Sequence, residues 1–205
     1  MTLDKEKILD ECIKITKSHR KKVFGAYVFG SRVYGTSSES SDWDIILIAN
    51  SSSPEVEYKT DNLNIHVIVP DLADKYLRDN HIKAIECLCA PDWAVILPYY
   101  KWDEFVYKED SFRHNISHTV SNSWVKCKKK MEQGDYYIGV KSMFHSLRIA
   151  DFGVQFARER KINFESVNDI WDCISSKEWT WEELKDRYQP TRNQILTAFR
   201  TVTSK

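Results

Sequence analysis

The stretch that decides the fold is FGSRVYGTSSESSDWDIILI, which runs from Phe29 to Ile48. It leaves an apolar strand at Gly30, crosses a run of small polar residues, and places Asp42 and Asp44 at the start of a second apolar strand. Residues two apart in a strand point to the same face, so the two carboxylates meet there. Burying carboxylates is costly unless their charge is compensated. We therefore expect Asp42 and Asp44 to face either water or a cation.

The chemistry of this stretch favours the cation. Two carboxylates on one face repel each other unless a divalent ion lies between them, and oxygen ligands suit Mg²⁺ or Mn²⁺. Upstream, Gly30 lets the backbone approach a ligand closely, Ser31 offers a hydroxyl and an N–H at the start of an expected helix, and Arg32 adds positive charge. Alone, a Gly-Ser turn or an Asp-x-Asp pair is usually structural. In this order they predict a site for a metal-bound nucleoside triphosphate.

The neighbouring sequence alternates strands and helices. We expect a helix over residues 3–17, strands over 22–30, 43–50 and 62–69, and a helix after Pro70 with Asp71 as its N-cap. Residues 51–61 are interpreted as a turn or hairpin connection, and the apolar run 83–98 fits a helix, a strand or both. In the third strand, Asn64 and His66 share one face.

After about residue 108 the pattern becomes helical. Amphipathic segments cover roughly 110–132, 135–160, 165–175 and 180–188, and a last one follows Pro190. Thr180 and Glu183 form a capping box at the start of the fourth segment. The sequence therefore predicts an α+β protein, with an α/β core over residues 1–108 and a helical region over 109–205.

Composition excludes several classes of protein. The 30 basic and 30 acidic residues cancel, which argues against a general polyanion-coating protein. The five cysteines are scattered and lack zinc-site spacing, which favours free thiols. No leader-like N-terminus and no apolar run of about 20 residues is present. We expect a soluble, cytoplasmic protein with no membrane partner. The sequence does not determine the oligomeric state.

The motif also carries a family resemblance. Gly-Ser, ten intervening residues and DWDIIL resemble the signature of the DNA-polymerase-β-type nucleotidyltransferase superfamily. The fuller stretch FGSRVYGTSSESSDWDI is similar to a subgroup of predicted nucleotidyltransferases linked with RNA repair. KAIECLCAPD at 83–92 and KSMFHSLRIADFGVQFARERKINF at 141–164 resemble further segments of that subgroup.

The resemblance implies a fold and a reaction. It implies a nucleotidyltransferase-like mixed β-sheet flanked by helices, with the helical region 109–205 completing the nucleotide site. The implied reaction is the Mg²⁺- or Mn²⁺-dependent transfer of a nucleoside monophosphate from an NTP to an acceptor hydroxyl, such as that of RNA or tRNA. Asp42 and Asp44 would hold the metal, and Gly30, Ser31 and Arg32 would bind the nucleotide.

The expected helix over 141–160 adds a cationic face. Lys141, His145 and Arg148 lie at positions i, i+4 and i+7, and such a face is not expected to pack as core. One interpretation is an exposed basic stripe. The other, which the resemblance favours, is that all three residues bind the triphosphate.

The sequence departs from the family at a third acid. The superfamily carries a carboxylate on the third strand, and here Asn64 occupies that position, where it cannot act as a base. His66, on the same face, could accept the proton instead, and Asp61 is the alternative if the register differs. Two further hypotheses stay open: a catalytically silent nucleotide-binding or regulatory protein, and a minimal nucleotidyltransferase of the toxin–antitoxin type.

Overall fold

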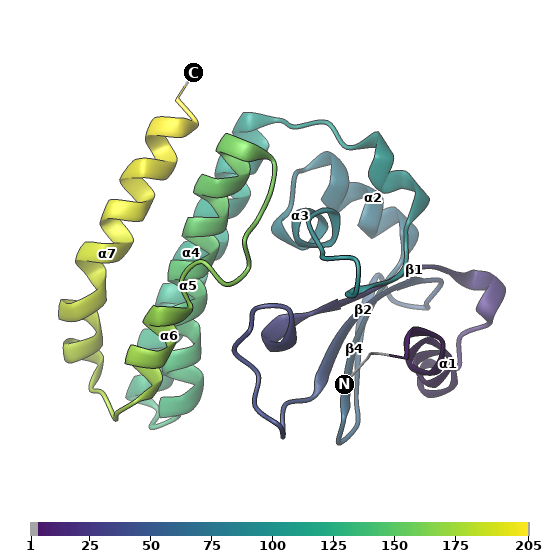
Figure 1. The fold of residues 1–205 in the computed structure, drawn as a ribbon, viewed down its shortest axis with the longest axis horizontal. Coiled ribbons are helices and arrows are strands. Elements are labelled where there is room, and N and C mark those ends of the chain that lie inside the picture. Colours follow the sequence, from purple (N-terminus) through teal and green to yellow (C-terminus); the bar gives the residue numbers. More distant parts are fainter. Residues whose placement is uncertain (1–3, 205) are drawn as a thin grey trace. The chain divides into compact units, whose positions relative to one another are not determined.

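The computed structural model describes residues 4–204. The chain divides into two compact units, Met1–Tyr107 and Lys108–Lys205, and each has a hydrophobic core of its own. Figure 1 shows the helices and strands of each unit. The first combines a sheet with three α-helices, and the second is helical throughout. Among residues 4–204, no helix is both long enough and apolar enough to span a membrane.

The first unit is built on a mixed five-stranded sheet in the order β3-β4-β2-β1-β5. Its β2 and β4 run parallel, and the other neighbouring pairs run antiparallel. The strands are β1 (Val23–Phe29), β2 (Trp43–Ala49), β3 (Glu55–Lys59), β4 (Leu63–Ile68) and β5 (Val95–Leu97). The helices are α1 (Lys5–Thr16), α2 (Pro70–Arg78) and α3 (Ile82–Leu88), with 3-10 turns η1 (Arg20–Lys22), η2 (Gly30–Arg32) and η3 (Tyr100–Glu104). The predicted α+β class is confirmed.

The central strand β2 is buried on both faces. Its apolar run from Ile45 to Ile48 is at most 2% exposed, as expected for a strand covered on both sides. Ile46 and Ile48 pack with residues of α2 and α3, including Leu77. Figure 1 shows these two helices over one face of the sheet and α1 beside the other. This burial fixes the register of β2 and so fixes where Asp42 and Asp44 lie.

Two local predictions for this unit need revision, and one alternative left open by the sequence is resolved. Residues 55–59 form strand β3 rather than part of a turn, because Val56 and Tyr58 pack on one face while Glu55, Glu57 and Lys59 stay exposed. Helix α2 has Val69 as its N-cap and Pro70 in its first turn, so Asp71 lies inside the helix. The apolar run 83–98 contains both a helix, α3, and a strand, β5.

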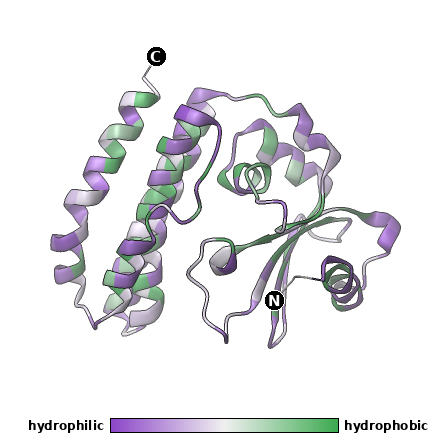
Figure 2. Cartoon of the chain, viewed as in Figure 1, coloured by the Kyte–Doolittle hydropathy of each residue, from purple (hydrophilic) through white to green (hydrophobic). Residues whose placement is uncertain are grey.

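The second unit consists of α4 (Glu109–Glu132), α5 (Tyr136–Glu159), α6 (Asn168–Ser175) and α7 (Trp181–Val202). Hydrophobic and hydrophilic residues alternate along the long helices (Figure 2), and the apolar side chains meet in a core that includes Phe144, Leu147 and Leu184. The capping box of Thr180 and Glu183 is confirmed.

The prediction of two helices around Pro190 is wrong, because α7 runs through it. Pro190 removes one backbone hydrogen bond but is exposed. Buried residues on both sides of it, Tyr188 before and Leu196 after, hold the two halves in one helix.

Candidate functional site

Asp42 and Asp44 lie at the beginning of β2. Asp42 directly precedes the strand, and Asp44 is its second residue. In the sheet register, Asp44 faces Phe29 of β1 on one side and Asn64 of β4 on the other. Both aspartates are partly buried, while the following residues of β2 are fully buried. The apolar strand thus positions two carboxylates at the edge of the core.

Gly30 passes directly over the carboxylate of Asp44. Its φ is +74°, a backbone conformation that residues other than glycine rarely adopt. A Cβ added at Gly30 would lie 2.1 Å from Oδ2 of Asp44 and 2.8 Å from its Cγ. Glycine is therefore required here twice, for its backbone conformation and for its missing side chain. The turn and the aspartate form one structural unit.

The turn itself is shorter than expected. Gly30, Ser31 and Arg32 form a 3-10 turn rather than the start of an α-helix, so the helix expected after Gly30 is absent from this segment. Arg32 braces the loop that follows: its guanidinium donates to the carbonyl oxygens of Ser41 and Asp42 and lies 4.2 Å from the ring centroid of Trp43. These contacts use some of its five N–H donors.

The loop is anchored at its other end by a buried pair. Tyr34 donates its hydroxyl hydrogen to Oε1 of Glu86 on α3, at 2.8 Å. Both residues are less than 10% exposed, at 6% and 8%. A buried carboxylate needs such hydrogen bonds to offset its lost hydration. The bond ties the segment after Gly30 to the helix that covers the sheet.

Asn64 and His66 lie where the sequence predicts, on one face of β4. The amide Nδ2 of Asn64 donates to Oδ1 of Asp44 at 3.0 Å and lies 3.4 Å from Nε2 of His66. The Oδ1 of Asn64 is buried and has no hydrogen-bond partner among residues 4–204, a cost that a bound donor would remove. Asp61 is exposed in the turn between β3 and β4, so Asn64 is the residue beside Asp44.

One charged neighbour of His66 was missed by the sequence interpretation. Glu57 of β3 pairs with His66 in the antiparallel register, and its Oε1 lies 3.6 Å from Nε2 of the histidine. The signal was present in the alternation of EVEYK, which places Glu55, Glu57 and Lys59 on one face. It was overlooked because the segment follows a Ser-Pro run that favours a turn.

The second unit holds the three cationic residues predicted on residues 141–160, but not as a fully exposed stripe. Lys141 is exposed, His145 is partly buried, and Arg148 is only 6% exposed. The guanidinium of Arg148 lies 5.3 Å and 5.9 Å from the ring centroids of Phe144 and Phe152, one turn before and one turn after it. The expectation that this face does not pack as core is therefore wrong for Arg148.

His145 is held in a defined state. Its Nδ1 lies 2.9 Å from NH2 of Arg148, a donor, so Nδ1 is the acceptor and the ring proton is on Nε2. Burial, together with the charges of Arg148, Lys126 and Lys141, lowers the pKa of His145 from 6.5 to about 3. The imidazole is therefore neutral near pH 7 and presents an N–H donor. Lys126 of α4, which the sequence interpretation did not assign to this cluster, belongs to it.

The donor set at Asp42 and Asp44 suits a divalent cation. Carboxylate oxygens are ligands that Mg²⁺ and Mn²⁺ prefer, and such ions are commonly held by one or two carboxylates together with substrate phosphates. Within residues 4–204 no group of three or more His, Cys, Asp or Glu side chains could hold a metal. A cation here would therefore depend on the two aspartates and on oxygens from the substrate.

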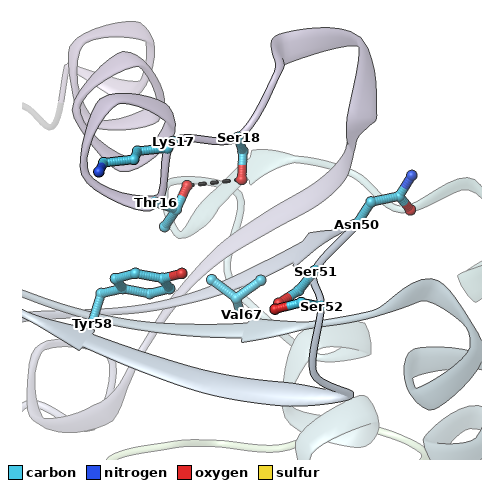
Figure 3. Close-up of a pocket in the computed structure, with 8 residues that line it drawn as sticks. All are labelled: Thr16, Lys17, Ser18, Asn50, Ser51, Ser52, Tyr58 and Val67. Atoms are coloured by element: carbon cyan, nitrogen blue, oxygen red, sulfur yellow. Dashed lines mark hydrogen bonds between the residues drawn. The ribbon is translucent and has the colours of Figure 1, made fainter.

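A separate pocket of about 210 Å³ lies at the other end of β2. Its walls come from the end of α1, the residues directly after β2, and strands β3 and β4 (Figure 3). Thr16 and Ser18 share a hydrogen bond there, and Lys17 is the only charged side chain in its lining. The pocket contains no carboxylate, so it is distinct from the aspartate site.

A comparison with models of protein families finds one match in the first unit. Residues 10–90 match the family model described as polymerase beta, nucleotidyltransferase. The matched segment contains Gly30, Asp42, Asp44 and Asn64. The predicted superfamily is thereby confirmed. The resemblance to the RNA-repair subgroup stays a prediction. No curated protein matches the chain.

Two solved structures are similar to the chain. One is a nucleotidyltransferase-like protein from Exiguobacterium sibiricum 255-15, at 13% identity and a TM-score of 0.36, covering 97% of this chain and 73% of that one. The other is spectinomycin adenyltransferase AAD(9) from Enterococcus faecialis with ATP and spectinomycin, at 12% identity and a TM-score of 0.43, covering 98% and 90%. At these scores the likeness adds nothing about substrates.

Proposed function

We propose, from the premise that residues 10–90 form a nucleotidyltransferase domain of the polymerase-β type, that this protein transfers a nucleoside monophosphate from an NTP to an acceptor hydroxyl. The single observation that carries the proposal is the approach of Gly30 to Asp44. Gly30 has no space for a Cβ because its backbone lies against the carboxylate of Asp44 at the edge of the core. Such a turn can present backbone groups to a ligand that the carboxylate holds.

The reaction balances without a further reactant. The acceptor oxygen forms a bond to the α-phosphorus, and the bond from that phosphorus to the bridging oxygen breaks. Pyrophosphate leaves with the electron pair, and the proton of the acceptor hydroxyl must go to a base. The protein acts mainly by positioning these groups and by stabilising negative charge.

Asp42 and Asp44 would hold Mg²⁺ or Mn²⁺. When bound, such an ion neutralises charge on the triphosphate and on the two carboxylates. Gly30, Ser31 and Arg32 would bind phosphate oxygens through the turn and the free N–H groups of the guanidinium. Asn64 orients Asp44 through its amide hydrogen bond. That bond holds one carboxylate oxygen and leaves the other directed toward Gly30.

The second part of the proposal is that polar side chains of α5 also bind the nucleotide. Lys141 and Arg148 would bind anionic groups of the nucleotide, and His145 would add a neutral N–H donor. The guanidinium of Arg148 lies beside the rings of Phe144 and Phe152, and these favourable contacts would hold it in one position for binding an anion. RNA or tRNA is the acceptor that the sequence resemblance favours.

A catalytically silent nucleotide-binding protein is the second candidate. The observation that favours it is Asn64, because an asparagine beside Asp44 can orient the carboxylate but cannot accept a proton. Such a protein would bind nucleotide with the same turn and aspartates and would not turn it over.

The two candidates are separated by one transfer assay. The protein is incubated with each labelled NTP, Mg²⁺ or Mn²⁺, and either total RNA or cell protein. We expect label in one acceptor with the wild type and only background with Asp42→Asn/Asp44→Asn. Asp61→Asn removes an exposed acid of the same domain and should label as the wild type does. Nucleotide binding without label in any acceptor would establish the silent protein, and label that persists in the double variant would refute the site.

A further inference from the structure

A row of polar side chains crosses three strands beside Asp44. On β4, Asn64 faces Asp44 of β2, and two residues further along the same face His66 faces Glu57 of β3. The imidazole of His66 rests edge-on against the ring of Phe29, with centroids 5.3 Å apart and an angle of 78° between the planes. Its side chain is 25% exposed and that of Glu57 is 54% exposed. The ring is thus held by packing and still reached by solvent.

The same ring nitrogen of His66 has two different neighbours. Nε2 lies 3.4 Å from Nδ2 of Asn64, which can only donate, and 3.6 Å from Oε1 of Glu57, which in its ionised form can only accept. When Nε2 is unprotonated, it can accept a hydrogen bond from the amide of Asn64. When Nε2 is protonated, it can donate to the carboxylate of Glu57. The side chain therefore has a suitable partner both before and after it takes up a proton.

The other charged groups near His66 are already engaged or belong to the aspartate site. Glu55 of β3 lies within electrostatic reach of His66, but its Oε1 accepts from Lys83 of α3. Lys59 of β3 is exposed and pairs with Asn64 rather than with His66. Asp44 of β2 accepts from Asn64. Glu57 is therefore the carboxylate that can receive a proton-bearing Nε2.

We propose that the pair of His66 and Glu57 takes up the proton of the acceptor hydroxyl, in place of the carboxylate that Asn64 cannot supply; the inference rests on the proposed nucleotidyl transfer. The O–H bond of the acceptor breaks as its oxygen bonds to the α-phosphorus, and the proton forms an N–H bond at Nε2 of His66. Glu57 is a positioning residue. It holds the charged imidazole through the new N–H and stabilises its charge.

The alternative is a cross-strand ion pair that serves only stability. Pairs of this kind at exposed positions contribute little to stability, and they act on folding rather than on turnover. The two interpretations differ in what Glu57→Gln does. A structural pair predicts an unchanged kcat, whereas a proton-accepting pair predicts a lower kcat with an altered pH profile.

The test compares His66→Gln, Glu57→Gln and the control Glu55→Gln in the labelled transfer assay across a range of pH. We expect kcat to fall by ~10²–10⁴-fold in His66→Gln and about tenfold in Glu57→Gln, with KM for the nucleotide changed less than about twofold. The acidic limb of the kcat profile should move in Glu57→Gln. Glu55→Gln is the control: it removes a carboxylate from the same face of β3 as Glu57, and it should retain the wild-type kcat.

A second measurement is independent of turnover. The ¹⁵N shifts of the His66 ring report which nitrogen carries the proton, and at one fixed pH they should differ between the wild type and Glu57→Gln. Identical ring shifts in the two proteins, or wild-type kcat in either His66→Gln or Glu57→Gln, would overturn the pair while leaving nucleotidyl transfer intact. A wild type that transfers no nucleotide would overturn the pair together with the proposed function.

Discussion

Gly30 and Asp44 show how closely single residues are fitted at the site. The glycine has a positive φ and no space for a side chain, because the carboxylate of Asp44 occupies that space. The carboxylate in turn accepts from the amide of Asn64. Each of these residues restricts its neighbour, so a change at one of them acts on the geometry of the whole site.

Replacing Gly30 by alanine should therefore cost more than backbone strain alone. Gly134 provides a matched control, because its φ is +75° against +74° for Gly30 and nothing lies within 4 Å of its added Cβ. We expect Gly134→Ala to lower the free energy of unfolding by about 1–2 kcal/mol. Gly30→Ala should lower it further and abolish nucleotide transfer, as measured by urea unfolding and by the labelling assay. Equal losses of stability in the two variants would contradict the close contact.

His145 should influence how the stability of the protein depends on pH. Its folded pKa, lowered to about 3 by burial and by Arg148, lies below the ordinary value of 6.5 that the unfolded chain retains. Between these values the unfolded state binds the extra proton. The stabilising effect of a neutral His145 is therefore complete above about pH 6.5 and is progressively lost as the pH falls toward about 3.

The variant His145→Asn tests this direction. Asparagine still offers an acceptor to Arg148 but does not titrate. Urea unfolding should show that the wild type loses more stability than the variant between about pH 7 and about pH 5. A variant that loses as much stability as the wild type over this interval would exclude His145 as the responsible group.

At the scale of elements, the sequence predicts what depends on local periodicity and misses what depends on packing. The apolar strands and the amphipathic helices follow directly from the spacing of their side chains. The sequence misses strand β3 because the Ser-Pro run before it favours a turn, and it divides α7 because Pro190 is a strong local helix breaker. In both elements, apolar residues that pack on one face outweigh the local signal.

The capping box of α7 allows a quantitative test at this scale. The hydroxyl of Thr180 accepts from the backbone N–H of Glu183, and the carboxylate of Glu183 accepts from the backbone N–H of Thr180. Thr180→Ala should lower the free energy of unfolding by about 1 kcal/mol. Thr201→Ala, which removes a hydroxyl that only bonds to the carbonyl of Thr197, should change it by less than about 0.5 kcal/mol. Equal effects of the two substitutions would argue against the box.

At the scale of the whole molecule, the sequence predicts the candidate site residues of the first unit, but it does not predict which side chains from other strands contact them. Asp42, Asp44, Asn64 and His66 were all expected on one side of the sheet. The partner strand that brings Glu57 to His66 depends on the register of β3, which the sequence alone did not fix. The burial of Arg148 depends likewise on two aromatic rings one turn away on either side.

The most direct test of the central claim is the divalent-ion dependence of nucleotide binding. Calorimetry with a non-hydrolysable NTP analogue compares the wild type, Asp44→Asn and Asp61→Asn, each with and without Mn²⁺. If Asp44 holds the ion, Mn²⁺ should tighten binding to the wild type and to Asp61→Asn, and this gain should disappear in Asp44→Asn, a loss of about tenfold or more in affinity. An equal gain from Mn²⁺ in Asp44→Asn would contradict the account.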